Sequence, residues 1–328
     1  QMMNVIISEN LQDSEFIEKY AEGFEYLKEA VKDFTPERFE RETGVKKELI
    51  TEAARMYAKA GSAAICYTMG ITQFSDGTSN VFSLSNLAIL TGNLGKKGAG
   101  VNPLRGQNNV QGSCDMGALP NVIPAGAVNS AYAQEQARKV WHFELNPVPG
   151  FKLTYAPDKM DSGELKVLYV YGENPVMSDP WTEHFVHATH HLDCFIVQDL
   201  FFTESAQKAD VVLPAAGWGE KDGTFINTSR RVQRTRKASE PVGGVEPDWK
   251  VVCNIAKAMG LEGFDFLSAE EVWDELRKLM PKFFGGISYY RLEKLGGISW
   301  PCPDEDHPGT PDLYTDHKSM LPDGKFRL

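Results

Sequence analysis

Apolar positions in the first third of the chain mostly follow helical spacing. Between residues 13 and 60 they recur every three or four positions, and a Thr-Pro pair at 35–36 supplies a capping hydroxyl and a first-turn proline. A short apolar run at residues 62–69 has the length of a strand, and residues 70–73 predict a turn. Residues 81–90 return to helical spacing. This alternation predicts an α/β fold with few strands.

Three short apolar runs in the second half of the chain predict the strands of a parallel sheet. They cover residues 167–171, 195–198 and 210–213, with helical stretches between them. Apolar strands joined through helices are typical of a doubly wound sheet with both faces covered. Residues 224–237 then alternate polar side chains and carry four arginines. That pattern predicts a strand or hairpin that leaves the parallel sheet for a small β-containing domain.

Polar residues follow two of the predicted strands where each strand ends. Gly172, Glu173 and Asn174 come after the first strand, and Asp199 and Thr203 come after the second. Ligands of open α/β sheets bind at this carboxyl edge. A glycine turn can bring backbone N–H groups to a diphosphate, and a carboxylate can accept both guanine N–H groups or bind a ribose diol. For Asp199, capping of the following helix is an equally good interpretation.

A stretch of 37 residues, 98–134, carries only two charges, Arg105 and Asp115, although charged residues make up 24% of the chain. Glycines and amides dominate its centre, so backbone can approach a ligand closely and uncharged donors and acceptors are available. A single guanidinium in this setting suits two-pronged binding of a small carboxylate, and Gln107 can bind the same oxygens. The alternative is a loop in which Arg105 pairs with a carbonyl or an acid.

Charge and cysteine usage exclude several classes of function. The net charge of -11 and the pI of about 5.2 argue against binding to nucleic acid or to an acidic membrane surface. No apolar run is long enough to span a bilayer, so no membrane contact is expected from this segment. The five cysteines are scattered and form no Cys-x-x-Cys pair, so we expect neither a disulfide framework nor a metal cluster. This usage fits a reducing, cytoplasmic location.

Three histidines and a cysteine lie close together at His187, His190, His191 and Cys194. Some of these side chains could share one helical turn, but a helix–strand junction comes before the cysteine. No second cluster completes a tetrahedral zinc site. The sequence therefore predicts a structural or solvent-facing role for this group, and no metal ligand anywhere in the chain.

The order of these motifs resembles that of the molybdenum- and tungsten-dependent formate dehydrogenases, within the molybdopterin oxidoreductase superfamily. The resemblance extends over nearly the whole chain and is most specific at residues 104–117. Further matching segments are residues 70–74, 90–95, 172–175, 197–201 and 218–225.

The resemblance implies a function and a set of site residues. In that family, two molybdopterin guanine dinucleotides hold one Mo or W, a 4Fe-4S cluster carries electrons away to an electron-transfer subunit or domain, and formate is reversibly oxidised to CO2. By resemblance, Arg105 would hold or orient formate, with help from Gln107. Met69 and Gln73 would contact one pterin cofactor. The guanine dinucleotide of the other would be held by Gly172, Glu173, Asn174, Asp199, Thr203, Gly223 and Asp274.

The same resemblance implies two Rossmann-like cofactor-binding domains, the first of them partial, and part of a small β-containing domain. Residues 1–107 would end the first domain, and residues 108–222 would form the second, which continues through about 249–274. Residues 223–248 and 275–328 would belong to the small domain. The cysteine or selenocysteine that ligates the metal, and the cysteines of the cluster, have no counterpart here. We therefore expect an internal fragment that, alone, is inactive and retains no cofactor.

Two other functions remain open at this point. The first is a structural or interaction homologue that has lost its cofactor, and the second is a molybdoenzyme that acts on another small oxyanion. Loss of the cofactor would remove selection on Arg105, Gln107 and Asp199, yet all three are in place. The sequence around Arg105 favours formate over nitrate, N- or S-oxides and arsenate.

Overall fold

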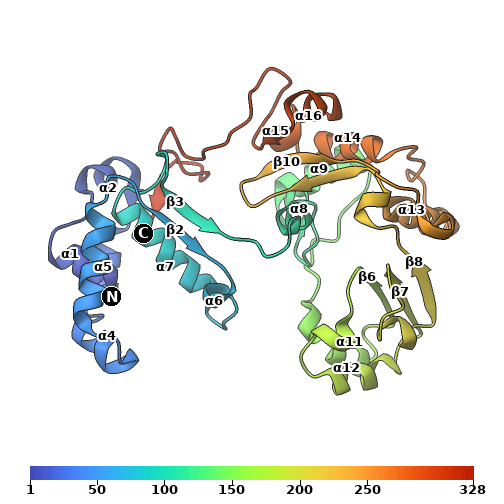
Figure 1. The fold of residues 1–328 in the computed structure, drawn as a ribbon, viewed down its shortest axis with the longest axis horizontal. Helices are drawn as coiled ribbons and strands as arrows, with labels where there is room; N and C mark the ends of the chain where they lie inside the picture. The colour runs from blue at the N-terminus through green and yellow to red at the C-terminus, as the bar shows by residue number, and fades with distance from the viewer. The chain divides into compact units, whose positions relative to one another are not determined.

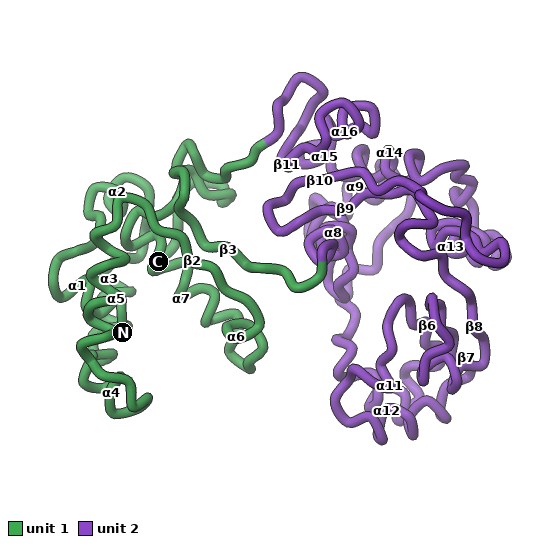
Figure 2. Tube along the Cα trace, in the orientation of Figure 1, with its two compact units in different colours: residues 1–107, 310–328 green, residues 108–309 purple.

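The computed structural model describes residues 1–328 and divides them into two compact units (Figure 2). Unit 1 comprises Gln1–Gln107 and Thr310–Leu328, and unit 2 comprises Asn108–Gly309. Helices alternate with short strands in both units, which confirms the α/β class. The finer division into three domains stays a prediction. No helix combines the length and the apolar character that crossing a bilayer requires.

Five helices form the first part of unit 1, and two of them begin at side-chain caps. The Asp13 carboxylate accepts the Phe16 N–H at 2.9 Å, and the Thr35 hydroxyl accepts the Arg38 N–H at 3.3 Å. Pro36 occupies the first turn, as predicted. The helices are α1 (Met2–Ser8), α2 (Ser14–Tyr20), α3 (Phe24–Val31), α4 (Pro36–Thr43) and α5 (Lys47–Lys59).

Strands β2 (Ala64–Tyr67) and β3 (Gly100–Pro103) pair in parallel in unit 1. Helices α6 (Met69–Thr72) and α7 (Gly77–Leu90) connect them. The turn predicted at residues 70–73 is wrong in detail, because a helical hydrogen bond closes there and makes α6 a single helical turn. Since the two strands are parallel, the segments that follow them emerge at the same edge.

Residues from near both ends of the chain contribute to the core of unit 1. Strand β1 (Ala21–Glu22) pairs in parallel with β12 (Phe326–Arg327). Phe326 is buried together with Ile6 of α1 and Leu90 of α7. The last residues therefore contribute a short strand that packs into this core.

Unit 2 contains the predicted parallel sheet, in the order β6–β7–β8. Its strands are β6 (Val167–Tyr171), β7 (Cys194–Asp199) and β8 (Val211–Pro214), which confirms the three predicted strands. Helices α11 (Pro175–Ser178) and α12 (Thr182–Thr189) follow β6 in the chain and lie beside the sheet (Figure 1).

The helices cover only one face of strand β6. Phe185 and Ala188 of α12 are buried, and Leu168 of β6 packs against them. α10 (Ala156–Asp161) joins this cluster through the buried Met160. On the opposite face of β6 the alternate residues Val167, Tyr169 and Tyr171 are 36% to 54% exposed. This face of β6 is therefore open, where the apolar pattern predicted cover on both faces of the sheet.

The arginine-rich segment forms the predicted hairpin, with β9 (Gly223–Ile226) antiparallel to β10 (Arg231–Thr235). β11 (Ile298–Ser299) adds a third strand on the far side of β10. The core beneath this sheet contains Ile226, Val232, Trp273, Phe284 and Leu292. Its helices are α14 (Ala269–Leu279), α15 (Pro281–Phe284) and α16 (Tyr289–Leu295).

The charge-poor segment at residues 98–134 contains regular structure. Besides β3 it holds the helix α8 (Val110–Asp115), the strand pair β4 (Val122–Ile123) and β5 (Gly126–Ala127), and the start of α9 (Ala131–Trp141). The remaining elements of unit 2 are α13 (Asp248–Ala258) and the 3-10 turns η1 (Leu153–Tyr155), η2 (Ala206–Lys208), η3 (Trp218–Glu220) and η4 (Val242–Gly244).

A buried polar chain links the parallel sheet to α13. Gln198 of β7 is fully buried, and its Nε2 donates to Asp248 Oδ1 at 2.7 Å. The Tyr169 hydroxyl donates to Gln198 Oε1, and the Lys221 ammonium forms an ion pair with Asp248. Four side chains from four segments thus satisfy one another around the buried Gln198 amide and Asp248 carboxylate.

Candidate functional site

The carboxyl ends of β2 and β3 place two predicted site residues at one edge of unit 1. The Leu104 N–H donates to the Tyr67 carbonyl at 2.8 Å, so the pairing continues one residue beyond β3. Arg105 follows directly, and Met69 begins α6 two residues after β2 ends. Both side chains are exposed. This register brings the backbone at Arg105 and the segment that carries Met69 to the same edge.

Apolar and amide side chains lie on the two segments that carry Met69 and Arg105. Met69, Phe74 and Leu104, which lie on the segments after β2 and β3, are 50% to 60% exposed. Gln73 ends α6 and Gln107 ends the amino-terminal segment of unit 1, and both are exposed. A small carboxylate could bind here through the guanidinium and the amides.

Five predicted site residues of unit 2 lie at the carboxyl edge of the parallel sheet: Gly172, Glu173, Asn174, Asp199 and Thr203. Gly172 follows β6 with φ +65°, and no atom lies within 4 Å of the position that a Cβ would take. Its N–H donates to the Gln198 carbonyl at 2.9 Å, which fixes the turn to β7. Open space above a glycine turn is what close approach of a phosphate requires.

Asn174 fastens the loop after β6 to the loop after β7. Its Oδ1 accepts from the Ser205 N–H at 3.0 Å and from the Ser205 hydroxyl at 2.7 Å. Its Nδ2 donates to Glu204 Oε2 at 2.8 Å. Because both ends of the amide are engaged, Asn174 positions these loops, and any contact with a ligand would have to use its remaining hydrogen-bonding capacity.

Asp199 and Thr203 each make one local hydrogen bond. Asp199 Oδ1 accepts the Phe201 N–H at 3.2 Å, and Thr203 Oγ1 accepts the Ala206 N–H at 3.2 Å, at the start of η2. The Asp199 carboxylate thus closes a local turn and does not cap the following helix, while Thr203 binds the first N–H of η2. Asp199 Oδ2 has no protein donor, so one carboxylate oxygen remains available at the strand end.

Two carboxyl groups lie together beside this turn. Burial raises the pKa of Glu173, and the nearby Asp179 carboxylate raises it further, while a 3.4 Å hydrogen bond from the Ser178 hydroxyl opposes the rise. Burial also raises the pKa of Asp179. The pair is therefore more easily protonated than free carboxylates, and a protonated carboxyl can donate to a phosphate or carbonyl oxygen.

Gly223 and Asp274 belong to a different part of unit 2. Gly223 begins β9, and Asp274 lies on α14, where its carboxylate accepts from Arg277 Nη1 at 2.8 Å. Both therefore lie on the antiparallel sheet and its helices, while the other five predicted residues share the edge of the parallel sheet.

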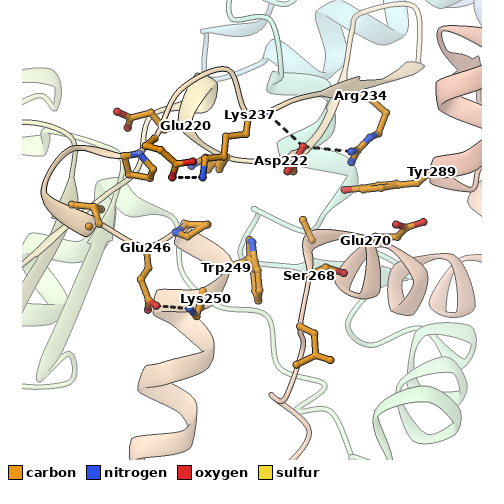
Figure 3. A pocket seen from close by; sticks show the side chains of 18 residues that line it. Glu220, Asp222, Arg234, Lys237, Glu246, Trp249, Lys250, Ser268, Glu270 and Tyr289 are labelled. Carbon is orange, nitrogen blue, oxygen red and sulfur yellow. Dashed lines mark hydrogen bonds and ion pairs between the residues drawn. The ribbon is translucent and has the colours of Figure 1, made fainter.

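Beside the hairpin lies a cavity of about 560 Å³ that the sequence did not predict (Figure 3). The guanidinium of Arg234 stacks 3.6 Å above the Tyr289 ring and pairs with Asp222 at 3.5 Å. Trp249 projects toward the space below, and Lys221 also lines it. The only sequence signal was the density of arginines in residues 224–237, which does not reveal that residues 249 and 289 complete the wall.

Comparison with known proteins adds to this geometry. The model of the molybdopterin oxidoreductase family matches residues 1–258. The chain is 50% identical to the F420-dependent formate dehydrogenase subunit alpha of Methanocaldococcus jannaschii, over 100% of this chain and 48% of that protein. It is 45% identical to formate dehydrogenase H of Escherichia coli, over 92% of this chain and 42% of that protein. The chain thus spans about half the length of these relatives.

A solved structure is similar in fold. Acetylene hydratase from Pelobacter acetylenicus superposes with a TM-score of 0.73 at 20% sequence identity, over 100% of this chain and 46% of that one. At this identity the likeness bears on the arrangement of helices and strands alone.

Proposed function

Because this chain belongs to the molybdopterin oxidoreductase family, we propose that it forms part of the catalytic subunit of a formate dehydrogenase. The reaction is the reversible oxidation of formate to CO2 with release of one proton and two electrons. The observation that carries this proposal is the place of Arg105, at the carboxyl edge of β2 and β3 that the segment carrying Met69 shares. The identities of 45% and 50% to proteins named formate dehydrogenase support it.

Membership of the family supports a molybdopterin cofactor with Mo or W, and we propose the form with two guanine dinucleotides. The residues present fit one guanine dinucleotide at the edge of the parallel sheet. Gly172 leaves space for a diphosphate, Asp199 Oδ2 can accept guanine N–H groups, and the Thr203 hydroxyl can donate to a phosphate or a sugar. When bound, the metal–pterin group accepts the two electrons that leave formate.

Arg105 and Gln107 bind and orient formate in this proposal. The planar guanidinium can donate two parallel hydrogen bonds to a carboxylate and replace part of the water that formate loses on entry. Met69 and Gln73 would lie against the pterin at the same edge. We further propose that a 4Fe-4S cluster passes the electrons to an electron-transfer subunit or domain.

The test is to express the complete reading frame that encodes this chain and to assay the metal-loaded product. We expect formate-dependent reduction of a viologen dye, and no oxidation of the reduced dye by nitrate or dimethyl sulfoxide. Oxyanion reduction without formate oxidation would point to the molybdoenzyme alternative. Absence of both Mo and W from the purified protein would point to the cofactor-free homologue.

Asp199→Asn is expected to remove discrimination between guanine and adenine. The amide keeps the size of the side chain and can still accept the Phe201 N–H. It cannot accept two guanine N–H groups in the same way. The 328-residue chain should bind guanosine diphosphate about tenfold more tightly than adenosine diphosphate, and the variant should bind both about equally. Calorimetry measures both affinities.

The matched control is Asp193→Asn, an exposed carboxylate at the amino end of the same strand, which should leave the preference for guanine unchanged. Equal guanine preference in the Asp199 variant and the original chain would remove Asp199 from the proposed site, without touching the role proposed for Arg105.

A further inference from the structure

One cluster of imidazole and carboxylate groups takes no part in the proposed reaction. Asp161, the last residue of α10, faces histidines from α12 and the turn that follows it. Asp161 Oδ2 lies 2.8 Å from His184 Nε2, and Asp161 Oδ1 lies 3.0 Å from His191 Nδ1. The rings of His187 and His191 meet edge to face, with centroids 5.5 Å apart.

The packing of α12 explains why these side chains converge. Phe185 and Ala188 turn into the core that Met160 of α10 shares, which leaves His184 half-buried at the edge of that face and His187 exposed. The buried Met160 also fixes the adjacent Asp161 at the rim of the same core. The cluster is thus held by two packed helices, although its polar atoms reach the surface.

The geometry suits a transition-metal ion. One donor atom from each of Asp161, His187 and His191 lies within 4.8 Å of the other two. Zinc–nitrogen and zinc–oxygen bonds are about 2.0–2.2 Å, so donors up to about 4 Å apart can share one ion. Small rotations of these exposed side chains would bring the three donor atoms within about 4 Å of one another. Two imidazoles with one carboxylate favour zinc over calcium or magnesium, which prefer oxygen ligands.

If the cluster were only a surface ion pair, the Asp161 carboxylate would have no permanently charged partner. Both ion-pair partners of Asp161 are histidines, which carry charge only when protonated. The nearby Lys159 pairs with Glu164 instead. A divalent cation would supply the positive charge that no lysine or arginine provides here.

We propose that Asp161, His187 and His191 form a zinc site that joins α10 to α12, with water completing the coordination. His184 is a positioning residue, because its hydrogen bond holds the carboxylate in place. The sequence had suggested no metal at these histidines. It missed Asp161, which lies 26 positions before His187 and reaches it only through helix packing, while Cys194 begins β7 instead.

The test is a zinc titration of the 328-residue chain, stripped with EDTA, in competition with a chromophoric chelator. We expect one zinc ion to bind per chain with micromolar affinity. His187→Ala and His191→Ala should each weaken binding at least about tenfold, and His184→Ala should weaken it about tenfold. His190→Ala is the matched control, since this exposed histidine of the same segment lies outside the cluster, and its affinity should stay within about twofold.

A second measurement separates metal binding from folding. Zinc should raise the midpoint of thermal unfolding of the original chain and of the His190 variant, and leave the His187 and His191 variants unchanged. Circular dichroism without zinc should be the same for all of them. Failure of the original chain to bind zinc below millimolar concentration would overturn the site, as would equal affinity in all four variants.

Discussion

Replacing Arg105 by alanine is expected to lower kcat/KM for formate by at least about 100-fold, the usual effect of removing one donor that is aimed at developing charge. The loss follows from the role proposed for the guanidinium, which comes directly after the extended pairing of β2 and β3. The measurement is dye reduction over a range of formate concentrations, in the product of the complete reading frame.

Two further variants show whether the effect comes from the guanidinium. Arg105→Lys keeps the charge and loses the planar fork, so its rate should fall between the alanine variant and the original. Arg41→Ala removes an exposed arginine of α4 and should leave the rate unchanged. Metal content should be equal throughout. A formate rate for Arg105→Ala within twofold of the original would exclude the proposed role.

Asp248→Ala is expected to lower the free energy of unfolding by about 3 kcal/mol, because it leaves the partly buried ammonium group of Lys221 without its carboxylate partner. Burial already lowers the pKa of Lys221, which shows that this position disfavours an uncompensated charge. The amide of Gln198 also loses its acceptor. Urea unfolding of the 328-residue chain, followed by circular dichroism, measures the loss.

The stability of the Asp248→Ala variant should change with pH in one direction. With Asp248 removed, Lys221 binds its proton less tightly in the folded state than in the unfolded state. The unfolded chain then holds more protons, so the stability of the variant should rise as pH increases toward the ordinary lysine pKa of 10.5. The double change Lys221→Met with Asp248→Leu should recover most of the loss. A loss that is independent of pH, with no rescue, would contradict the buried ion pair.

Short apolar runs predicted the parallel strands well, because these strands carry apolar or aromatic residues on both faces, including the open face of β6. The predicted runs at residues 167–171, 195–198 and 210–213 differ from β6, β7 and β8 by at most one residue at either end. Position relative to those strands also predicted which polar residues would share an edge. Gly172, Asn174 and Asp199 were selected in this way, and the structure brings them together.

Long-range contacts explain what the sequence did not predict. α8 forms within a glycine- and amide-rich segment, where Asn109 Oδ1 accepts the Ile226 N–H at 2.9 Å from β9. Asp115, one of two charges in that stretch, accepts the Trp300 indole N–H at 2.9 Å, so its charge serves the fold. These partners lie more than 100 positions away, so the local pattern of apolar and polar residues could not predict the contacts. Asp161 was missed beside the histidines for the same reason.

The hydrogen bonds of the Asn174 amide would couple the two loops that contact a bound nucleotide. Because the amide ties the segment carrying Thr203 and Ser205 to the turn that begins at Gly172, neither loop can shift without breaking hydrogen bonds at 2.7–3.0 Å. Ordering one loop around the base therefore also orders the other around the phosphates. Nucleobase and phosphate contacts should reinforce each other, so a mononucleotide would gain more affinity than the sum of its two halves bound separately.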